Sequence, residues 1–447
     1  MVISMKQSRY TLVKTEYPRS DYVLLYNTLT KAVATVRADE WSKIGTSNES
    51  EISPEIVSSL FREGIICENE DSEVAKLNMY FTNLKSRYYS YATMILTSYA
   101  CNMSCPYCFE NKIKNNHNTM TTQTAKDTAE WIKEELQQYQ PKYAGIAFSG
   151  GEPLYNKEAV EIIIRELKDY CDQHNIGFSF GFLTNGTISI SDEEAKLYSS
   201  CGISFIQYTV DGDRDVNNAR RVIEGGSYDI IINNIAHNNA IMDVQTIVRV
   251  NIDKDNSAHI EGLLDDLKML NIRNLTIDYA MRFETPCDIY SSNNAVLSSR
   301  EVPESLINCQ KLTKDKGLNH SRRFTSDTPC LAIVPRQFVI DPEGYLYKCA
   351  AFVGEKDYAV GSIYEESLYK KYIEIVGNDA WHECKDCPYV PLCGGGCLFL
   401  NRNATGNYLK RKCQHFLFDN IVMETLASSL DAQKLNEQLR CKELNTQ

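Results

Sequence analysis

The sequence has no long apolar run and no secretory signal. None of its apolar stretches approaches the ~18 residues that suggest a membrane span. The first residues, Met1 to Lys6, lack the apolar segment and small-residue cleavage site of a signal peptide. We therefore expect a cytoplasmic protein with no membrane partner. Because disulfide bonds are rare in reducing cytosol, clustered cysteines are expected to bind metal or carry out redox chemistry.

Positive charge is also in deficit. The 447 residues hold 47 Lys and Arg against 59 Asp and Glu, a formal net charge of −12. A general nucleic-acid binder shows a basic footprint, whereas the pairs Arg220-Arg221 and Arg322-Arg323 are short and are expected to be solvated surface. We expect no nucleic-acid partner. The hydrophobic content of 43% is ordinary for a soluble globular chain, and this length predicts two or three domains.

The first domain is expected at residues 1–85. Two short strand-like runs, Tyr22 to Tyr26 and Ala32 to Val36, flank turn residues and predict a hairpin. Ser53-Pro54 then marks a helix start. This pattern predicts a small α+β unit that is similar to a winged helix.

In the second domain, residues 86–300, strands and helices alternate, which predicts an α/β fold with a parallel sheet or barrel. In such folds the chemistry lies at the C-terminal ends of the strands. The expected strands are Ala92 to Thr97, Tyr143 to Phe148, Gly177 to Leu183, Ile203 to Val210, Asp243 to Val250 and Asn274 to Tyr279. The third domain, residues 301–447, is expected to be loop-rich up to a terminal helix at 414–440.

Three of the 16 cysteines follow the first strand directly with the spacing C-x3-C-x2-C: Cys101, Cys105 and Cys108. Three thiolates can hold three irons of a cubane cluster and leave the fourth iron open for a chelating ligand such as S-adenosylmethionine (SAM). A structural zinc site normally closes with four ligands, and no fourth Cys or His is local. The loop therefore predicts a [4Fe–4S] cluster.

This loop resembles the signature of the radical SAM superfamily, and other motifs match that family. Ser149 to Pro153 resembles its GGEP motif, which engages the SAM amino group, and Thr184-Asn185-Gly186 resembles a segment near SAM. Thr209-Val210-Asp211-Gly212 resembles a strand end in which relatives have Ser in place of Thr. Tyr107 is expected beside the adenine. The resemblance implies a partial (β/α)6 barrel and assigns the SAM contacts to Tyr107, Gly150, Gly151, Glu152, Pro153, Asn185, Thr209 and Arg249. Arg249 is a candidate for the SAM carboxylate, with a solvated arginine as the alternative.

Seven further cysteines fall between residues 330 and 413. Any pair alone fits a zinc ribbon, but together their spacing resembles the SPASM extension of radical SAM enzymes, which carries two auxiliary [4Fe–4S] clusters. The resemblance assigns an outer cluster to Cys384, Cys387, Cys393 and Cys413. It assigns an inner cluster to Cys330, Cys349 and Cys397. The inner cluster then lacks an obvious fourth ligand, and Cys309, Cys287, a substrate thiolate or no ligand at all remain open.

The N-terminal unit resembles the element with which enzymes that modify ribosomally made peptides bind the leader of a precursor peptide. There the leader adds a strand to a hairpin edge. The leading hypothesis is a peptide maturase that forms thioether links, from a cysteine sulfur to a carbon, after a 5′-deoxyadenosyl radical abstracts hydrogen. A flavodoxin or ferredoxin is the expected electron donor. No catalytic side chain is identified.

Three alternatives remain open. A carbon–carbon crosslinking enzyme fits the sequence, which offers no discriminator. A sulfatase-maturing enzyme, which makes formylglycine, is another; that family places an Asp directly after the Gly-x4-Cys cysteine, where this chain has Ala350. Asp341 and Asp278 are possible substitutes for that base. A non-catalytic zinc-binding scaffold is the alternative from a different class.

Overall fold

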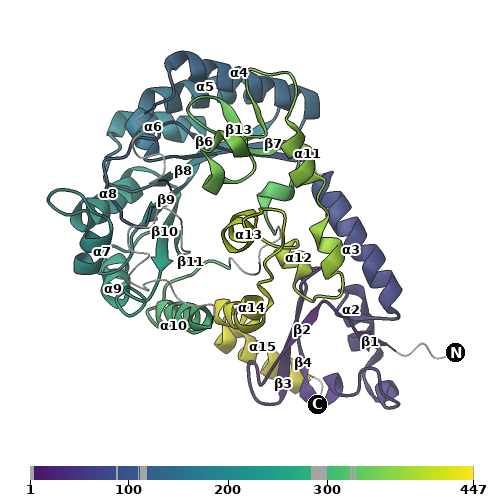
Figure 1. The fold of residues 1–447 in the computed structure, drawn as a ribbon. Coiled ribbons are helices and arrows are strands. Elements are labelled where there is room, and N and C mark those ends of the chain that lie inside the picture. The colour runs from purple at the N-terminus through teal and green to yellow at the C-terminus, as the bar shows by residue number, and fades with distance from the viewer. Residues whose placement is uncertain are drawn as a thin grey trace.

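The structure is a computed structural model that describes residues 5–86, 89–108, 110, 118–282, 300–322, 325 and 329–445. Figure 1 shows a curved sheet with helices along its outer side, a cysteine-rich C-terminal segment on the inner side, and the N-terminal elements beside that segment. Among the described residues, no helix combines the length and the apolar character needed to cross a membrane.

One sheet of nine strands forms the centre, in the order β11-β10-β9-β8-β7-β6-β12-β13-β14. Its strands β6 to β11 pair in parallel, each with its neighbour in sequence. Their bounds are β6 Ser90–Leu96, β7 Tyr143–Ser149, β8 Gly177–Thr184, β9 Ile203–Thr209, β10 Gln245–Ile252 and β11 Leu275–Met281. The intervening helices are α4 Thr122–Tyr139, α5 Lys157–Gln173, α6 Asp192–Cys201, α7 Arg214–Arg220, α8 Tyr228–Ile241 and α9 Glu261–Met269. This arrangement confirms the predicted partial (β/α)6 barrel.

Burial alternates along the barrel strands, as it must when one face packs on helices and the other faces the barrel interior. In β10, Val248 and Val250 are fully buried, whereas Arg249 between them is only partly buried. Arg249 is in register with Thr209 of β9 and with Asp278 of β11. The pairing thus places these three side chains on one rung of the inner face.

The C-terminal segment extends the barrel sheet. Strand β12 runs parallel to β6 and forms a hairpin with β13, which pairs with β14. The strands are β12 Gln337–Ile340, β13 Tyr345–Tyr347 and β14 Gly361–Ser362; the α-helices are α10 Glu301–Asp315, α11 Lys370–Val376, α12 Val390–Cys393, α13 Leu398–Thr405, α14 His415–Ser429 and α15 Ala432–Asn445; the 3-10 helices are η6 Leu331–Ile333, η7 Ala350–Phe352, η8 Lys356–Tyr358 and η9 Ala380–Cys384.

The expected single helix at 414–440 is two helices. Leu430, at the end of α14, adopts an extended conformation with φ −90° and ψ 147°. This breaks the helical ladder, and α15 begins at Ala432. The sheet continues from β6 of the barrel into β12 of the C-terminal segment, so the two predicted domains share one sheet. The domain boundary expected at residue 300 therefore stays a prediction.

The N-terminal elements include a three-stranded antiparallel sheet in the order β2-β3-β4. The predicted hairpin corresponds to β3 and β4, and the helix expected at Ser53-Pro54 begins at Pro54. The elements are β1 Lys6–Gln7, β2 Thr11–Thr15, β3 Tyr22–Asn27, β4 Val33–Arg37, α1 Ala38–Trp41, η1 Glu49–Glu51, α2 Pro54–Arg62, β5 Ile66–Cys67 and α3 Glu70–Lys85.

This unit packs against the cysteine-rich segment. The ring of Phe81 on α3 stacks on that of Trp381, with centroids 4.5 Å apart. The Tyr10 hydroxyl donates to the Lys385 carbonyl at 2.8 Å. The β2 side of the sheet lies beside α14, where the Tyr17 hydroxyl donates to the carbonyl of Ala427 at 3.0 Å. The opposite edge, β4, pairs only with β3 among the described residues.

Candidate active site

The cysteine loop follows β6 at the C-terminal end of the barrel. Within it, the Met103 amide donates to the Cys101 sulfur at 3.4 Å, and the Ser104 amide donates to the Val222 carbonyl at 2.8 Å. Burial raises the pKa of the Cys101 and Cys108 thiols. A metal cluster opposes this effect because it binds the thiolate form and displaces the proton.

The spacing of possible metal ligands matters for the alternative that the cysteines bind zinc. In the described part of the chain, no three Cys, His, Asp or Glu side chains are close enough together to hold a single metal ion. Tetrahedral zinc would need sulfur atoms only about 3.8 Å apart, given its ~2.3 Å bonds. In a cubane each thiolate binds its own iron, so the sulfurs lie farther apart. The loop itself supplies three thiolates, which leaves one iron of a cubane open, whereas a structural zinc site normally closes with four ligands.

Gly150 and Gly151, which follow β7, pass directly beside the cysteine loop. The Gly151 amide donates to the Ser98 carbonyl at 2.9 Å. A Cβ on Gly151 would lie 2.4 Å from the Ala100 carbonyl oxygen, and Gly150 has φ +137°. No other residue fits this approach, which explains physically why the motif has glycines.

Glu152 is fully buried and connects two strand ends. Its carboxylate accepts hydrogen bonds from the Leu154 amide at 3.1 Å, the Thr184 hydroxyl at 2.7 Å and the Asn185 amide at 2.7 Å. Burial raises the pKa of this carboxyl, and the hydrogen bonds act in the opposite direction. A carboxylate has about four acceptor positions, so one stays available. Contact with the SAM ammonium remains a prediction.

Asn185 joins the end of β8 to the cysteine loop. Its Nδ2 donates to Asn102 Oδ1 at 2.9 Å and to the Cys101 sulfur at 3.6 Å. Pro153 begins the short 3-10 helix η3 Pro153–Asn156, which follows the glycines. The structure thus brings the predicted residues from the ends of β6, β7 and β8 together around one loop.

Tyr107, between two of the cysteines, lies in a cage of charged groups. Arg220 and Arg282 lie over its ring, with guanidinium carbons 5.0 and 5.4 Å from the centroid. Its hydroxyl donates to Asp211 and accepts from Arg221 Nη1 at 2.9 Å. Burial and the Asp211 charge raise the pKa of Tyr107. The position of the adenine beside Tyr107 stays a prediction.

The expectation that Arg220-Arg221 is solvated surface is wrong. These residues are 8% and 7% exposed, because carboxylates at two strand ends draw their side chains inward. Arg220 forms a double hydrogen bond with buried Asp253 at 2.8 and 2.9 Å. Arg221 lies beside the cysteine loop, where its Nη2 is 3.7 Å from the Met103 sulfur, and its buried Nε has no hydrogen-bond partner within the described residues.

Arg249, by contrast, is engaged inside the barrel. Its Nη1 lies 2.6 Å from Asp278 Oδ2, and the Ser321 hydroxyl donates to the other oxygen of Asp278 at 2.5 Å. Its assignment to the SAM carboxylate stays a prediction. Arg221 is the cation that the sequence reasoning missed, and an Arg-Arg pair after a short helix carries no signal of burial.

The family model of the Radical SAM superfamily matches residues 95–267, from the end of β6 into α9. These residues form a radical SAM domain. The chain is 25% identical over 339 residues to a cysteine-type anaerobic sulfatase-maturating enzyme of Clostridium novyi (strain NT), covering 69% of this chain and 87% of that protein.

Two other similar proteins span more of the chain. Radical SAM cyclopropyl synthase TigE of Paramaledivibacter caminithermalis is 23% identical over 403 residues, covering 83% of this chain and 82% of that one. The structure of Streptococcus suis SuiB bound to precursor peptide SuiA superposes with a TM-score of 0.53 at 16% identity, covering 91% of this chain and 99% of that chain. The likeness to SuiB shows the fold.

A radical SAM domain implies SAM and a [4Fe–4S] cluster, and the residues described above fit both. Cys101, Cys105 and Cys108 supply three thiolates from one loop. The glycines after β7 leave room for a ligand to approach the backbone. The partnerless Nε of Arg221 is a buried donor beside that loop, suited to a carboxylate.

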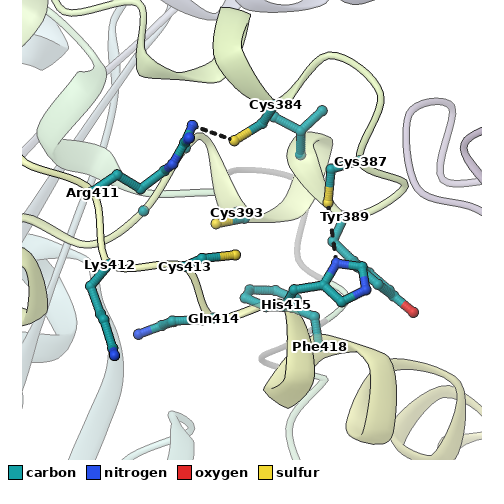
Figure 2. A pocket seen from close by; sticks show the side chains of 13 residues that line it. Cys384, Cys387, Tyr389, Cys393, Arg411, Lys412, Cys413, Gln414, His415 and Phe418 are labelled. Atoms are coloured by element: carbon teal, nitrogen blue, oxygen red, sulfur yellow. Dashed lines mark hydrogen bonds between the residues drawn. The ribbon is translucent and has the colours of Figure 1, made fainter.

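A second site lies in the C-terminal segment. Cys384, Cys387, Cys393 and Cys413, the four cysteines assigned to the outer cluster, line one pocket with about 340 Å³ of empty space, part of it open to solvent. Figure 2 shows their sulfur atoms around this space. Arg411 Nη1 lies 2.8 Å from the Cys384 sulfur and His415 Nδ1 lies 3.6 Å from that of Cys387.

The residues assigned to the inner cluster lie beside the ends of η6, β13 and α13. Cys330 precedes η6, Cys349 follows β13, and Cys397 precedes α13. Burial raises the pKa of Cys330, and the Cys397 thiolate adds to the effect. Cys309 lies apart on α10, where its buried thiol donates to the Ser257 carbonyl at 3.7 Å. Cys287 lies outside the described residues.

Proposed function

We propose that this protein is a maturase of a ribosomally made precursor peptide and that it links a cysteine sulfur of the peptide to a carbon. The observation that carries the proposal is the open edge of β4 on a sheet that packs against the cysteine-rich segment. The likeness to SuiB, whose structure holds a precursor peptide, and the similarity to mycofactocin maturase MftC of Mycolicibacterium smegmatis support a peptide as the substrate.

The leader of the peptide is proposed to add a strand to β4. Residues of this strand are half-buried or exposed except Val36, and Val33 at its start is 44% exposed. A peptide in extended conformation gains main-chain hydrogen bonds from such an edge. The opposite edge is not equivalent, because α14 lies beside β2 and the Lys14 side chain pairs with Glu424 there.

The proposed active site lies at the C-terminal end of the barrel. Cys101, Cys105 and Cys108 would hold the cluster, Gly150 to Pro153 and Asn185 would bind the methionine end of SAM, and Arg221 would meet its carboxylate. When SAM and the reduced cluster are bound, they supply a 5′-deoxyadenosyl radical that abstracts an unactivated hydrogen. The barrel residues position the peptide so that the C–H bond and the thiol meet in one site.

The three-cysteine inner site is the reason for choosing a thioether. Cys330, Cys349 and Cys397 are proposed to hold a second cluster and Cys384, Cys387, Cys393 and Cys413 a third. Because Cys309 donates to Ser257, the inner set offers three thiolates, which leaves a position that a cysteine of the peptide can fill.

Sulfatase maturation is the second candidate, because sulfatase-maturating enzymes are among the similar proteins. The chain has Ala350 where the resemblance expects the Asp base. The two residues that could replace this base, Asp341 and Asp278, already bind other groups. Asp341 accepts from the hydroxyl of Tyr99 at 2.7 Å and from two backbone amides at 2.9 Å, and Asp278 pairs with Arg249.

Product analysis tests the proposal. Anaerobic reconstituted protein, with reductant, SAM and a Cys-containing precursor peptide encoded beside it, should give a peptide lighter by two hydrogens per link. The number of free thiols should fall by one per link, since each link consumes one sulfur. A peptide in which that Cys is replaced by Ser serves as the control and should stay unmodified. A lighter product with all thiols free would indicate a carbon–carbon link instead and contradict the thioether.

We further propose that a small acidic electron carrier, a flavodoxin or ferredoxin, docks beside the outer cysteine pocket. Residues 380–415 hold five Lys and Arg against two acidic residues, although the whole chain has a net charge of −12. Lys410, Lys412 and Cys413 are exposed there. Opposite charges accelerate association at low ionic strength.

Replacing Lys410 and Lys412 together by Glu should slow reduction by such a carrier on the order of tenfold at low salt. The rate with dithionite, a small-molecule reductant, should stay unchanged and serves as the control. Stopped-flow absorbance measures both rates. Equal carrier rates and equal salt dependence in the two proteins would place the docking surface elsewhere.

A further inference from the structure

Lys348 is a buried cation without a carboxylate partner among the described residues. It stands in the chain between the end of β13 and Cys349, and the residue is only 4% exposed. Its Nζ donates to the backbone carbonyls of Val334, Pro335 and Gln337. An ammonium group has three protons to donate, so the three carbonyls match its protonated form.

The surroundings provide dipoles and aromatic faces but no negative charge from a carboxylate. Nζ lies 4.9 Å from the ring centroid of Phe338 and 5.9 Å from that of Tyr372. No ion pair involving Lys348 occurs among the residues that the structure describes, and the nearby Arg336 carries the same charge. A buried charge is costly unless an opposite charge compensates it.

The chain geometry brings Lys348 to the inner set of cysteines. Its Nζ donates to the carbonyls of Val334 and Pro335, which directly follow η6, and the Ile333 amide of η6 donates to the Cys330 carbonyl at 3.3 Å. Cys330 and the adjacent Cys349 are both among the three cysteines assigned to the inner cluster. The Lys348 ammonium therefore lies beside the inner set of cysteines, where thiolates and a bound cluster would carry negative charge.

We propose that Lys348 is the counter-ion of the inner iron–sulfur cluster and that it raises the reduction potential of that cluster. The proposal rests on the proposed function, in which Cys330, Cys349 and Cys397 hold this cluster. One-electron reduction adds a negative charge to an already anionic group. In a poorly solvated site a fixed cation stabilises the reduced form more than the oxidised form, so its removal should make reduction harder.

A purely structural role predicts something different. The ammonium links the carbonyls around η6 and the start of β12, so its loss would lower thermal stability in any case. If Lys348 has only this structural role, its loss should not change the reduction potential of an inner cluster that still assembles. The potential therefore separates a counter-ion from a structural tether.

The test is an EPR-monitored redox titration of the full-length, anaerobically reconstituted chain with Cys101, Cys105 and Cys108 replaced by Ala, so that auxiliary signals alone remain. Lys348→Met and Lys348→Gln remove the charge, and Lys348→Arg keeps it. Lys356→Met is the matched control, because this lysine lies in the same segment with a side chain that is 58% exposed. The outer cluster is the internal reference.

At the midpoint potential of the parent protein, the ratio of reduced to oxidised inner cluster should fall at least tenfold in Lys348→Met and Lys348→Gln. For a one-electron couple a tenfold change equals 59 mV. In Lys348→Arg and Lys356→Met the ratio should change less than twofold. An unchanged ratio in an assembled Lys348→Met or Lys348→Gln protein would overturn the counter-ion role.

Failure of the proposed function gives a different result. Iron and sulfide near one cubane in the parent protein, with no inner-cluster signal, would show that the inner site is not a cluster site. If both neutral variants lose the inner cluster while Lys348→Arg retains it, the need for a cation is supported. Loss of the cluster in Lys348→Arg as well would indicate a steric requirement and overturn the proposal.

Discussion

Replacing Cys105 by Ala should abolish SAM cleavage. The loop offers only three thiolates, and the Cys105 residue is 8% exposed between the other two, so no neighbouring side chain in the loop can substitute. Loss of an outer-shell partner of a metal already costs about 10- to 100-fold in affinity or activity, and loss of a ligand should exceed that. The yield of 5′-deoxyadenosine, measured by chromatography, reports the effect, and the iron content should fall by one cubane.

Cys201→Ala is the matched control. Cys201 ends α6 and is 6% exposed, close to the value for Cys105, and it packs in the same core but lies outside the cysteine loop. Removing its sulfur should lower the melting temperature through lost packing and leave iron content and SAM cleavage per folded molecule unchanged. A Cys105→Ala protein that retained the parent iron content and SAM cleavage would contradict the assignment of the loop.

The barrel could be predicted from the sequence because its signals are local. Alternating burial in strands such as β10 and a capped helix such as α6, with Ser191 and Glu194 in a capping box, depend on residues a few positions apart. The cysteine loop is also a short motif. Its place at the C-terminal end of the barrel follows from coming directly after the first strand.

Features that depend on long-range contacts could not be predicted. Strand β12 is four residues long and gains its identity from pairing with β6, some 245 positions earlier in the case of Thr93 and Phe338. Arg221 is buried because Asp211 and Tyr107 reach it from other parts of the chain. A local pattern contains neither partner, so sequence reasoning treated the arginine as surface.

Glu152 illustrates the same limit within a recognised motif. The sequence indicates that a carboxylate stands after two glycines but not what it contacts. The structure shows that it holds the ends of β7 and β8 together through Thr184 and Asn185. Because Asn185 in turn contacts Cys101, the carboxylate organises the loop as well as offering an acceptor to a ligand.

Glu152→Gln should therefore weaken SAM binding at least about tenfold, which is ~1.4 kcal/mol, and lower stability by about 1–3 kcal/mol. The new amide NH₂ would face groups that are themselves donors, so buried hydrogen bonds would be lost, and the negative charge that attracts the SAM ammonium would be lost as well. Equilibrium binding of SAM to the reconstituted protein and thermal unfolding of the same sample measure the two effects separately.

Glu194→Gln separates binding from stability. Glu194 accepts from the Ser191 amide in the capping box of α6 and pairs with Lys157, so its replacement also removes a charge, although Gln can keep the capping-box hydrogen bond. That variant should lose up to about 1 kcal/mol of stability with the ion pair and bind SAM as the parent does, because it lies outside the loop network. If Glu152→Gln bound SAM with parental affinity although less stable, Glu152 would act as a brace for the two strand ends only, and the SAM ammonium would have to be held by backbone carbonyls of the glycine turn.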